Sequence, residues 1–347
     1  MSDREAWLAQ TVEEAIEPGL PICDPHHHFW DYPGSRYLLD EFVADIGAGH
    51  RVVKTVFVEC KQFYRSEGPE EFRPVGETEF IDRIAGPVNT LSGVTDVAAG
   101  IVGFADLSLG PAVQPVIEAQ LEASRRFRGI RYASAWDEND GVHNAHTHPP
   151  RGLLGDQVFR EGLACLEKPG LSFDAWLYHP QIPELTDLAR AFPGLTIVLN
   201  HMAGPLGIGP YAGKREEVFE VWRRNMEELA NCENVSIKLG GLTMAMSGFG
   251  WSKREIPPGS RELAEAMGPY YRSCIEQFGV QRCMFESNFP VDRASCSYTV
   301  QWNAFKRLSS GYSDEERSAL FHDTANRIYR LNIESLSRED PGSPAPA

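Results

Sequence analysis

The strongest constraint on the fold is a repeated alternation of short apolar runs with helical patterns. Eight runs of β-type composition recur along the chain, at 20–23, 52–60, 97–105, 127–133, 171–177, 195–199, 235–239 and 283–285. Segments with helical spacing of apolar residues lie between or after them, at 112–126, 157–167, 183–192, 214–230, 262–278 and 314–331. Strand-type runs that alternate with helices are typical of parallel sheets. Eight of them predict an α/β fold, a closed (β/α)8 barrel.

The length of 347 residues suits one large barrel or two ordinary domains. We predict a single barrel domain over residues 21–332. Residues 1–20 have the pattern of an amphipathic helix that ends at Pro18-Gly19, and we predict a helical extension that packs outside the barrel. Residues 333–347 are rich in Pro, Gly and Ser, which predicts a flexible tail.

Composition narrows the class of protein and of partner. Hydrophobic residues make up 42% and charged residues 24% of the chain, as in a soluble globular protein. The net charge of −16 argues against a nucleic-acid partner, because binding phosphates requires a basic face. No apolar run reaches the roughly 18 residues of a membrane span. The acidic N-terminus lacks a signal-peptide pattern, and the seven scattered cysteines form no Cys-x-x-Cys pair, so a cytoplasmic location is expected.

Three consecutive histidines follow the first apolar run, in Asp24-Pro25-His26-His27-His28. If this segment is a strand, alternation places His26 and His28 on one face and His27 on the other. Two imidazoles on one face form half of a site for zinc, iron or manganese. A loop or a chance histidine tract is the alternative.

The strand ends that follow are rich in polar side chains. The residues at these ends are Glu59, Lys61, Asp106, Arg131, Asp137, His179, His201, Lys238, Glu286, Asn288 and Asp292. Active sites of such barrels gather at the carboxyl ends of the strands, so this pattern indicates an enzyme. Two long loops, 138–152 and 244–260, belong to the same rim, and the first is either a lid or a solvated insertion. Trp251 in the second loop suits a lid.

Several motifs in this order resemble the amidohydrolase superfamily. The resemblance is to the amidohydrolase-related or "amidohydrolase 2" group, which includes sugar-acid lactonases and 2-pyrone-4,6-dicarboxylate lactonase. It spans about residues 22 to 332. The motifs are Asp24-Pro25-His26-His27-His28-Phe29-Trp30-Asp31, Gly129-Ile130-Arg131, Leu171-Ser172-Phe173-Asp174, Val198-Leu199-Asn200-His201-Met202-Ala203-Gly204-Pro205, Ile237-Lys238-Leu239-Gly240-Gly241-Leu242 and Arg282-Cys283-Met284-Phe285-Glu286-Ser287-Asn288-Phe289-Pro290-Val291.

The resemblance implies hydrolysis or decarboxylation of small ring or carboxylate substrates, with or without one divalent metal. By motif match, His26 and His28 are metal ligands from the first strand and His201 is the histidine of the sixth. His179, in Tyr178-His179-Pro180, stands where metal-binding relatives carry a further ligand. A capped core histidine remains the alternative for His201, and a loop-orienting role for His179. Zinc is favoured as the metal, with manganese and iron as alternatives.

The eighth strand departs from the family pattern. Most relatives carry the water-activating aspartate where this chain has Asn288, and an amide cannot accept a proton at neutral pH. Glu286 lies two residues earlier, on the same face of a strand. Asp292, just past Pro290, is a second candidate base. The third alternative is a site without a carboxylate base.

These features predict a metal-dependent hydrolase of a small lactone, a carboxylic ester hydrolase. Arg131 would bind a substrate carboxylate in bidentate fashion, or form a salt bridge within the barrel. Lys238 would bind an anion or neutralise Glu286. Tyr178, Trp251 and Asn288 are further candidates for contact with the substrate. The alternatives are a decarboxylase on the same fold, a metal-free lactonase and a non-catalytic ligand-binding relative. The oligomeric state stays open, with a homo-oligomer among the alternatives.

Overall fold

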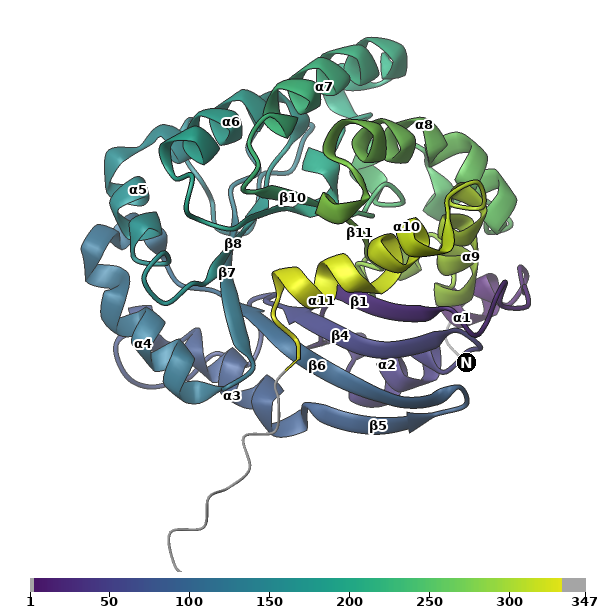
Figure 1. The fold of residues 1–347 in the computed structure, drawn as a ribbon, viewed down its shortest axis with the longest axis horizontal. Helices are drawn as coiled ribbons and strands as arrows, with labels where there is room; N and C mark the ends of the chain where they lie inside the picture. Colours follow the sequence, from purple (N-terminus) through teal and green to yellow (C-terminus); the bar gives the residue numbers. More distant parts are fainter. Residues whose placement is uncertain (1–2, 333–347) are drawn as a thin grey trace, which may run out of the picture.

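The computed structural model describes residues 3–332 and contains a nearly closed barrel of eight parallel strands (Figure 1). Neighbouring strands pair in parallel in chain order, so the predicted (β/α)8 barrel is confirmed. The barrel strands are β1 (Pro21–His27), β4 (Arg51–Val58), β6 (Gly93–Gly103), β7 (Phe127–Ala133), β8 (Ser172–Trp176), β9 (Ile197–Leu199), β10 (Val235–Leu239) and β11 (Cys283–Phe285). The predicted tail, 333–347, lies outside the described residues.

The first and last strands meet just beyond β11. The backbone N–H of Asn288 donates to the carbonyl of His26 (2.9 Å), and the N–H of His28 donates to the carbonyl of Phe289 (2.8 Å). The Asp24 side chain adds a bond from the backbone N–H of Ser287 (3.0 Å). The seam of the barrel is therefore made by the same segments that carry the histidine and eighth-strand motifs.

Helices surround the strands as an outer ring in Figure 1. They are α2 (Leu39–Ile46), α3 (Val75–Ile84), α4 (Gln114–Ala123), α5 (Gln157–Ala164), α6 (Ile182–Ala191), α7 (Arg215–Ala230), α8 (Ser260–Phe278) and α9 (Tyr298–Leu308). In α7 the buried residues are Val218, Trp222, Met226 and Leu229, which recur every three or four positions and form one apolar stripe. Among the helices of residues 3–332, none is both long and apolar enough to cross a membrane.

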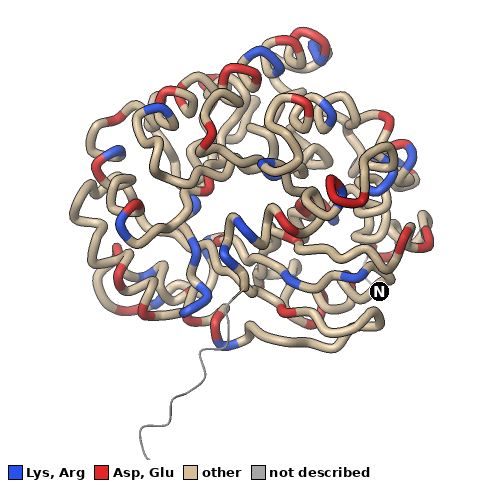
Figure 2. Tube along the Cα trace, viewed as in Figure 1, with Lys and Arg blue, Asp and Glu red and all other residues tan. Residues whose placement is uncertain are grey.

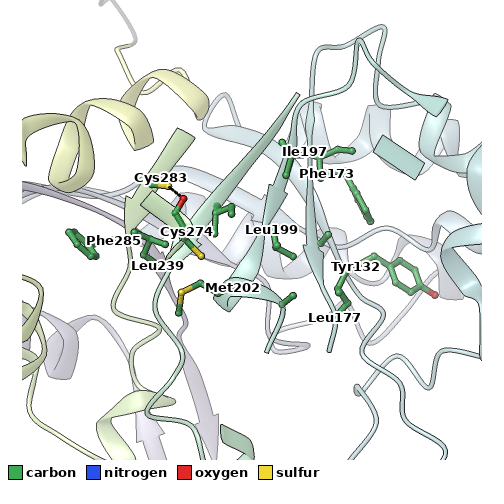
Figure 3. Close-up of a cluster of buried hydrophobic side chains, with 14 of the residues drawn as sticks. Tyr132, Phe173, Leu177, Ile197, Leu199, Met202, Leu239, Cys274, Cys283 and Phe285 are labelled. Carbon is green, nitrogen blue, oxygen red and sulfur yellow. Dashed lines mark hydrogen bonds between the residues drawn. The ribbon is translucent and has the colours of Figure 1, made fainter. Parts of the chain in front are cut away.

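The main core lies between the strands and the helices. Figure 3 shows part of it, with Phe173, Ile197, Leu199 and Phe285 from the strands among the buried side chains. Each such side chain contributes roughly 1.5–3 kcal/mol when it leaves water. Charged residues of both signs are distributed over the helical ring in Figure 2, while fewer lie on the strands inside it.

The predicted N-terminal helix is much shorter than expected. Helix α1 covers only Asp3–Leu8, and the apolar side chain of Val12, within the predicted helical range, is 80% exposed. The backbone that follows is held by other elements: the N–H of Ile16 donates to the side-chain oxygen of Asn303 in α9 (2.8 Å). This tertiary hydrogen bond takes the place of a backbone hydrogen bond within a helix.

Three short strands and three helices were not predicted. The strands are β2 (Trp30–Tyr32) and β3 (Ser35–Tyr37), which form a hairpin, and β5 (Gly86–Thr90), which pairs antiparallel with β6. The helices are α2, α3 and α9. Helix α9 is buried from Tyr298 through Lys306, including the polar side chains of Gln301 and Asn303, so its burial does not follow from its apolar residues alone.

The C-terminal segment closes the barrel at the amino ends of the strands. It runs as α10 (Asp314–Ser318), a π-helical turn (Ala319–Asp323) and α11 (Thr324–Ile328), which cross in front of the strands in Figure 1. Tyr329 and Leu331 pack with strand residues that point into the barrel, such as Val56 and Met284. The interior below the carboxyl ends is therefore filled.

Candidate active site

His26 and His27 end β1 and His28 follows it directly, and the three side chains alternate as predicted. His27 points outward, where its ring stacks on Phe42 at 4.1 Å and its Nε2 lies 2.9 Å from the hydroxyl of Thr55. His26 and His28 share the opposite face, with their Nε2 atoms 3.2 Å apart. The carbonyl of Val58 can only accept a hydrogen bond, so its 2.7 Å contact places the proton of His28 on Nδ1.

His201 joins this pair from the other side of the barrel. It lies just after β9 in the short turn Asn200–Ala203, and its ring centre is 4.5 Å from that of His26. His201 and Met202 both have positive φ, near 54° and 52°, a conformation that costs an L-residue roughly 1–2 kcal/mol. The indole of Trp222 donates to the carbonyl of Met202 (2.8 Å) and holds the turn in place.

Glu286 lies between His26 and His201. Its Oε1 accepts hydrogen bonds from Nδ1 (2.6 Å) and from the backbone N–H of His201 (3.2 Å). Its Oε2 is 2.9 Å from Nδ1 of His26, but it makes no hydrogen bond of good geometry with any residue that the structure describes. Burial raises the pKa of this carboxyl to about 8.

Two glycines after β10 make room for this group. A Cβ on Gly241, which has a φ of +74°, would lie 2.7 Å from Cβ of His201. A Cβ on Gly240 would overlap Cγ of Glu286. The Gly240-Gly241 pair in the seventh-strand motif is therefore a packing requirement of the site.

The donor set fits a divalent metal ion. His26, His201 and Glu286 each offer one ligand atom, and these atoms lie within 4.8 Å of one another. Burial, above all, lowers the pKa of His26 and of His201 well below the ordinary value and that of His28 to about 3, which keeps the imidazoles in the neutral form that metals bind. The 3.2 Å between the Nε2 atoms of His26 and His28 is close to the roughly 3.3 Å between two ligands of a tetrahedral zinc ion with bonds of about 2.0–2.1 Å.

Arg131 is held by Glu59 from the second barrel strand. Its Nε donates to Oε1 of Glu59 (2.6 Å), and Nη2 donates to the carbonyl of the same residue. Nε2 of His146, from the loop after β7, lies 3.6 Å from the other Glu59 oxygen. Burial opposes ionisation of Glu59, but Arg131 and His146 outweigh it and hold the pKa at about 2. The salt bridge within the barrel is thus present, and it occupies two of the guanidinium nitrogens.

Lys238 pairs with a different carboxylate from the one expected. Its Nζ donates to Oδ2 of Asp174 (2.8 Å) and lies 3.3 Å from Nδ1 of His26. The ion pair that the structure contains is with Asp174, which we had quoted only as part of a motif, and not with Glu286. Asp174 lies on β8 and Lys238 on β10, with β9 between them, so the contact crosses the barrel interior and depends on the register of three strands, which the sequence does not reveal.

Asn288 and Asp292 lie directly beyond β11. Asn288 has a φ of +55° and accepts the backbone N–H of Asp292 (3.2 Å) at its carbonyl. The buried carboxyl of Asp292 lies beside the Thr243 hydroxyl, the Gly241 backbone and the Asn288 amide. Burial raises its pKa to about 8.

The remaining predicted residues lie apart from the histidine group. Nδ1 of His179 accepts the backbone N–H of Leu206 (3.3 Å), and its ring lines a separate cavity of about 480 Å³ together with Asp137 and Tyr211. His179 is absent from the group of candidate ligands found in residues 3–332. The hydroxyl of Tyr178 donates to the carbonyl of His143 and so ties down the loop after β7.

Trp251 is part of the packing of the second long loop. Its ring stacks on that of Phe249 with centres 5.5 Å apart, and the guanidinium of Arg254 lies 5.3 Å from its centre. The indole is buried.

Comparison with known proteins identifies the family of this chain. A family profile described as amidohydrolase matches residues 23–331. The chain belongs to the amidohydrolase family. It is 34% identical over 337 residues to the uncharacterized protein y4mH of Sinorhizobium fredii, covering 90% of this chain and 99% of that protein. It is 26% identical over 325 residues to L-fucono-1,5-lactonase of Burkholderia multivorans, covering 90% and 97%.

A solved structure shares the fold of this amidohydrolase. It is an amidohydrolase of Burkholderia multivorans with bound zinc, which superposes with a TM-score of 0.67 at 22% identity and covers 89% of this chain and 99% of that chain.

Proposed function

We propose that this amidohydrolase opens a small lactone ring by hydrolysis. The observation that carries the proposal is the buried group of His26, His28, His201 and Glu286, which comes from the first, sixth and eighth barrel strands. Lactonases among the relatives support the choice of a cyclic ester.

The metal proposed for this site is one divalent ion, with zinc favoured because a relative of the same fold binds zinc. His26 and His28 would hold it through Nε2. Such an ion, when bound, polarises the ester carbonyl and lowers the pKa of a water molecule toward 7.

His201 and Glu286 are proposed to move the proton. Because Oε1 of Glu286 accepts the Nδ1 proton of His201, Nε2 of a neutral His201 carries a lone pair that can take a proton from water. The same nitrogen then returns the proton to the leaving ring oxygen. If His201 is instead a third metal ligand, as the family motif implies, Asp292 is the other carboxyl near the seam that can act as base.

Arg131 is proposed to bind one oxygen of the substrate. Glu59 occupies Nε and Nη2, while Nη1 makes no hydrogen bond to the described part of the chain. A single contact to a carboxylate or hydroxyl oxygen therefore fits better than the bidentate pair predicted from sequence.

The test is an assay of purified protein on a panel of sugar-acid lactones, with acid release as the readout, before and after chelation. We expect turnover of at least one lactone, loss of activity on chelation and recovery with zinc. Full activity after chelation would indicate a metal-free lactonase. Release of carbon dioxide from an aromatic acid without ring opening would replace the lactonase proposal with a decarboxylase.

Two variants separate the roles of the histidines. The double variant His26→Ala/His28→Ala should lose bound zinc, measured by elemental analysis, and keep its circular dichroism spectrum. His201→Ala should keep the zinc and lose activity. A His201→Ala protein without zinc would make His201 a ligand and transfer the role of base to a carboxyl.

A further inference from the structure

A buried polar network lies behind His26. Oδ2 of Asp174 accepts three hydrogen bonds: from Nζ of Lys238 (2.8 Å), from the hydroxyl of Tyr329 (2.7 Å) and from the side-chain amide of Asn200 (3.2 Å). The ammonium of Lys238 also lies 5.2 Å from the centre of the Tyr329 ring. Asp174 and the Tyr329 ring thus fix the position of Lys238, which is shielded from water, while Tyr329 and Asn200 hold Asp174 in turn.

From this position Lys238 reaches Nδ1 of His26 at 3.3 Å. An ammonium group has three N–H donors and no lone pair, so Nδ1 can only be the acceptor in this contact. A neutral imidazole carries one ring proton. The proton of His26 therefore belongs on Nε2.

The contacts of His28 place the proton of His26 on the same nitrogen, Nε2. The carbonyl of Val58 places the His28 proton on Nδ1, so Nε2 of a neutral His28 is an acceptor. Nε2 of His26, 3.2 Å away, must then be the donor. The hydrogen bonds run in one direction, from Lys238 through His26 and His28 to the backbone of β4.

This arrangement opposes the proposed metal. An ion between the two Nε2 atoms needs a lone pair on both, so the His26 proton has to move to Nδ1. A small movement would bring Oε2 of Glu286, 2.9 Å away, into position to accept it, but Lys238 has to give up its contact. Lys238 and Glu286 thus favour opposite proton positions on one ring.

We propose that Lys238, held in place by Asp174 and Tyr329, is a positioning residue that keeps the proton of His26 on Nε2 and thereby lowers the affinity of the site for a divalent metal. The consequence for affinity depends on the metal proposed above, whereas the proton position is a property of the metal-free protein. The fraction of protein with metal bound would then depend on the concentration of the free metal ion.

The main test uses the double variant Lys238→Met/Asp174→Asn, which removes both charges and so avoids leaving one buried charge alone. Nitrogen-15 NMR of the metal-free proteins reports which ring nitrogen of His26 carries the proton. Competition with a chromophoric chelator gives the zinc affinity. We expect the proton on Nε2 in the wild type, on Nδ1 in the variant, and zinc bound at least about tenfold more tightly by the variant.

The matched control is Lys306→Met. Nζ of Lys306 also contacts a histidine Nδ1, that of His50 at 2.9 Å, and both residues are buried away from the site. This variant should keep the wild-type zinc affinity and the wild-type proton position on His26.

A milder variant guards against failure of the double variant to fold. Tyr329→Phe removes one hydrogen-bond donor from Asp174. The carboxylate then attracts Lys238 more strongly, away from His26. We expect a rise in zinc affinity that is smaller than in the double variant. Tyr37→Phe is its control, because Tyr37 donates to Asp45 at the same 2.7 Å and Asp45 also pairs with a cation, Arg293.

Two results would overturn the inference. One is a wild-type His26 with its proton on Nδ1, and the other is equal zinc affinity in the wild type and in the folded variants. Absence of zinc binding in every protein would overturn the metal of the proposed function instead, and the NMR result would still decide the proton position.

Discussion

At the scale of single residues, burial sets the protonation of this site more than any one partner does. It raises the pKa of Glu286 and of Asp292 to about 8 and lowers that of His28 to about 3. The midpoints of both carboxyls therefore lie about one pH unit above neutral, near the working pH that suits a proton-transfer group.

Glu286→Gln should lower kcat by about 10²- to 10⁴-fold, because an amide oxygen still accepts the Nδ1 proton of His201 but cannot stabilise the imidazolium that forms. The fold should be retained. The control is Glu77→Gln, which alters another buried carboxyl with a pKa of about 8; within residues 3–332 it accepts hydrogen bonds from the backbone N–H groups and thiol of the Cys60–Gln62 segment. Equal loss of kcat in both variants would show that Glu286 acts through stability alone.

Asp292 makes the free energy of unfolding depend on pH in a defined direction. Its folded pKa of about 8 lies above the unfolded value of about 4, so the folded state binds more protons in that window. The stability that the protonated carboxyl contributes is complete below about pH 4 and is lost as the pH rises through 8. Asp292→Asn should remove this loss. In urea unfolding, the free energy of unfolding of the variant should therefore increase relative to that of the wild type as the pH rises. Parallel stability curves would contradict it.

At the scale of elements, the turn after β10 decides whether the histidine group can assemble. Gly241 faces His201 and Gly240 faces Glu286, so a strand end without side chains lets two other strands bring theirs together. The left-handed turn after β9 acts with it, since it presents His201 to that space.

Gly241→Ala should therefore lose most activity by displacing His201, whose Cβ would be 2.7 Å from the new methyl group. Gly152→Ala is the matched control: Gly152 has the same φ of +74° but nothing within 4 Å of its Cβ position. Both variants should lose roughly 1–2 kcal/mol of stability from the positive φ. Only Gly241→Ala should lose kcat, and similar kcat values in the two would remove the packing argument.

At the scale of the whole molecule, sequence periodicity was enough to predict the barrel, because buried parallel strands are short apolar runs and their polar ends must gather at one rim. It also placed His26 and His28 on one face and pointed to Glu286. It could not predict that Lys238 pairs with Asp174, that His179 lies in a separate cavity, or that α9 exists. The Lys238–Asp174 pair depends on the register of β8, β9 and β10, and the position of a loop residue depends on the path of its loop. In α9 the polar residues are buried together with the apolar ones, which the sequence does not indicate.

Closure of the barrel is also a property of the whole chain, because it joins segments more than 250 residues apart. The Asp24 side chain stabilises this seam. It accepts hydrogen bonds from the backbone N–H groups of His26 (3.3 Å) and Ser287 (3.0 Å) and from the hydroxyl of Tyr298 (3.0 Å). Asp24→Ala leaves these buried donors without an acceptor, and each such group costs about 1–3 kcal/mol.

We expect Asp24→Ala to open the seam before the rest of the barrel. In hydrogen exchange, the amides of His28 and Asn288, which bridge the seam, should exchange much faster than in the wild type, while the β7–β8 pairing should stay protected. Asp156→Ala is the control for a local loss of stability, since it removes a helix cap worth about 0.5–2 kcal/mol at α5, away from the seam. Uniform acceleration in all strands of Asp24→Ala would mean that the barrel opens only by global unfolding, and that the seam is no weaker than the other strand pairs.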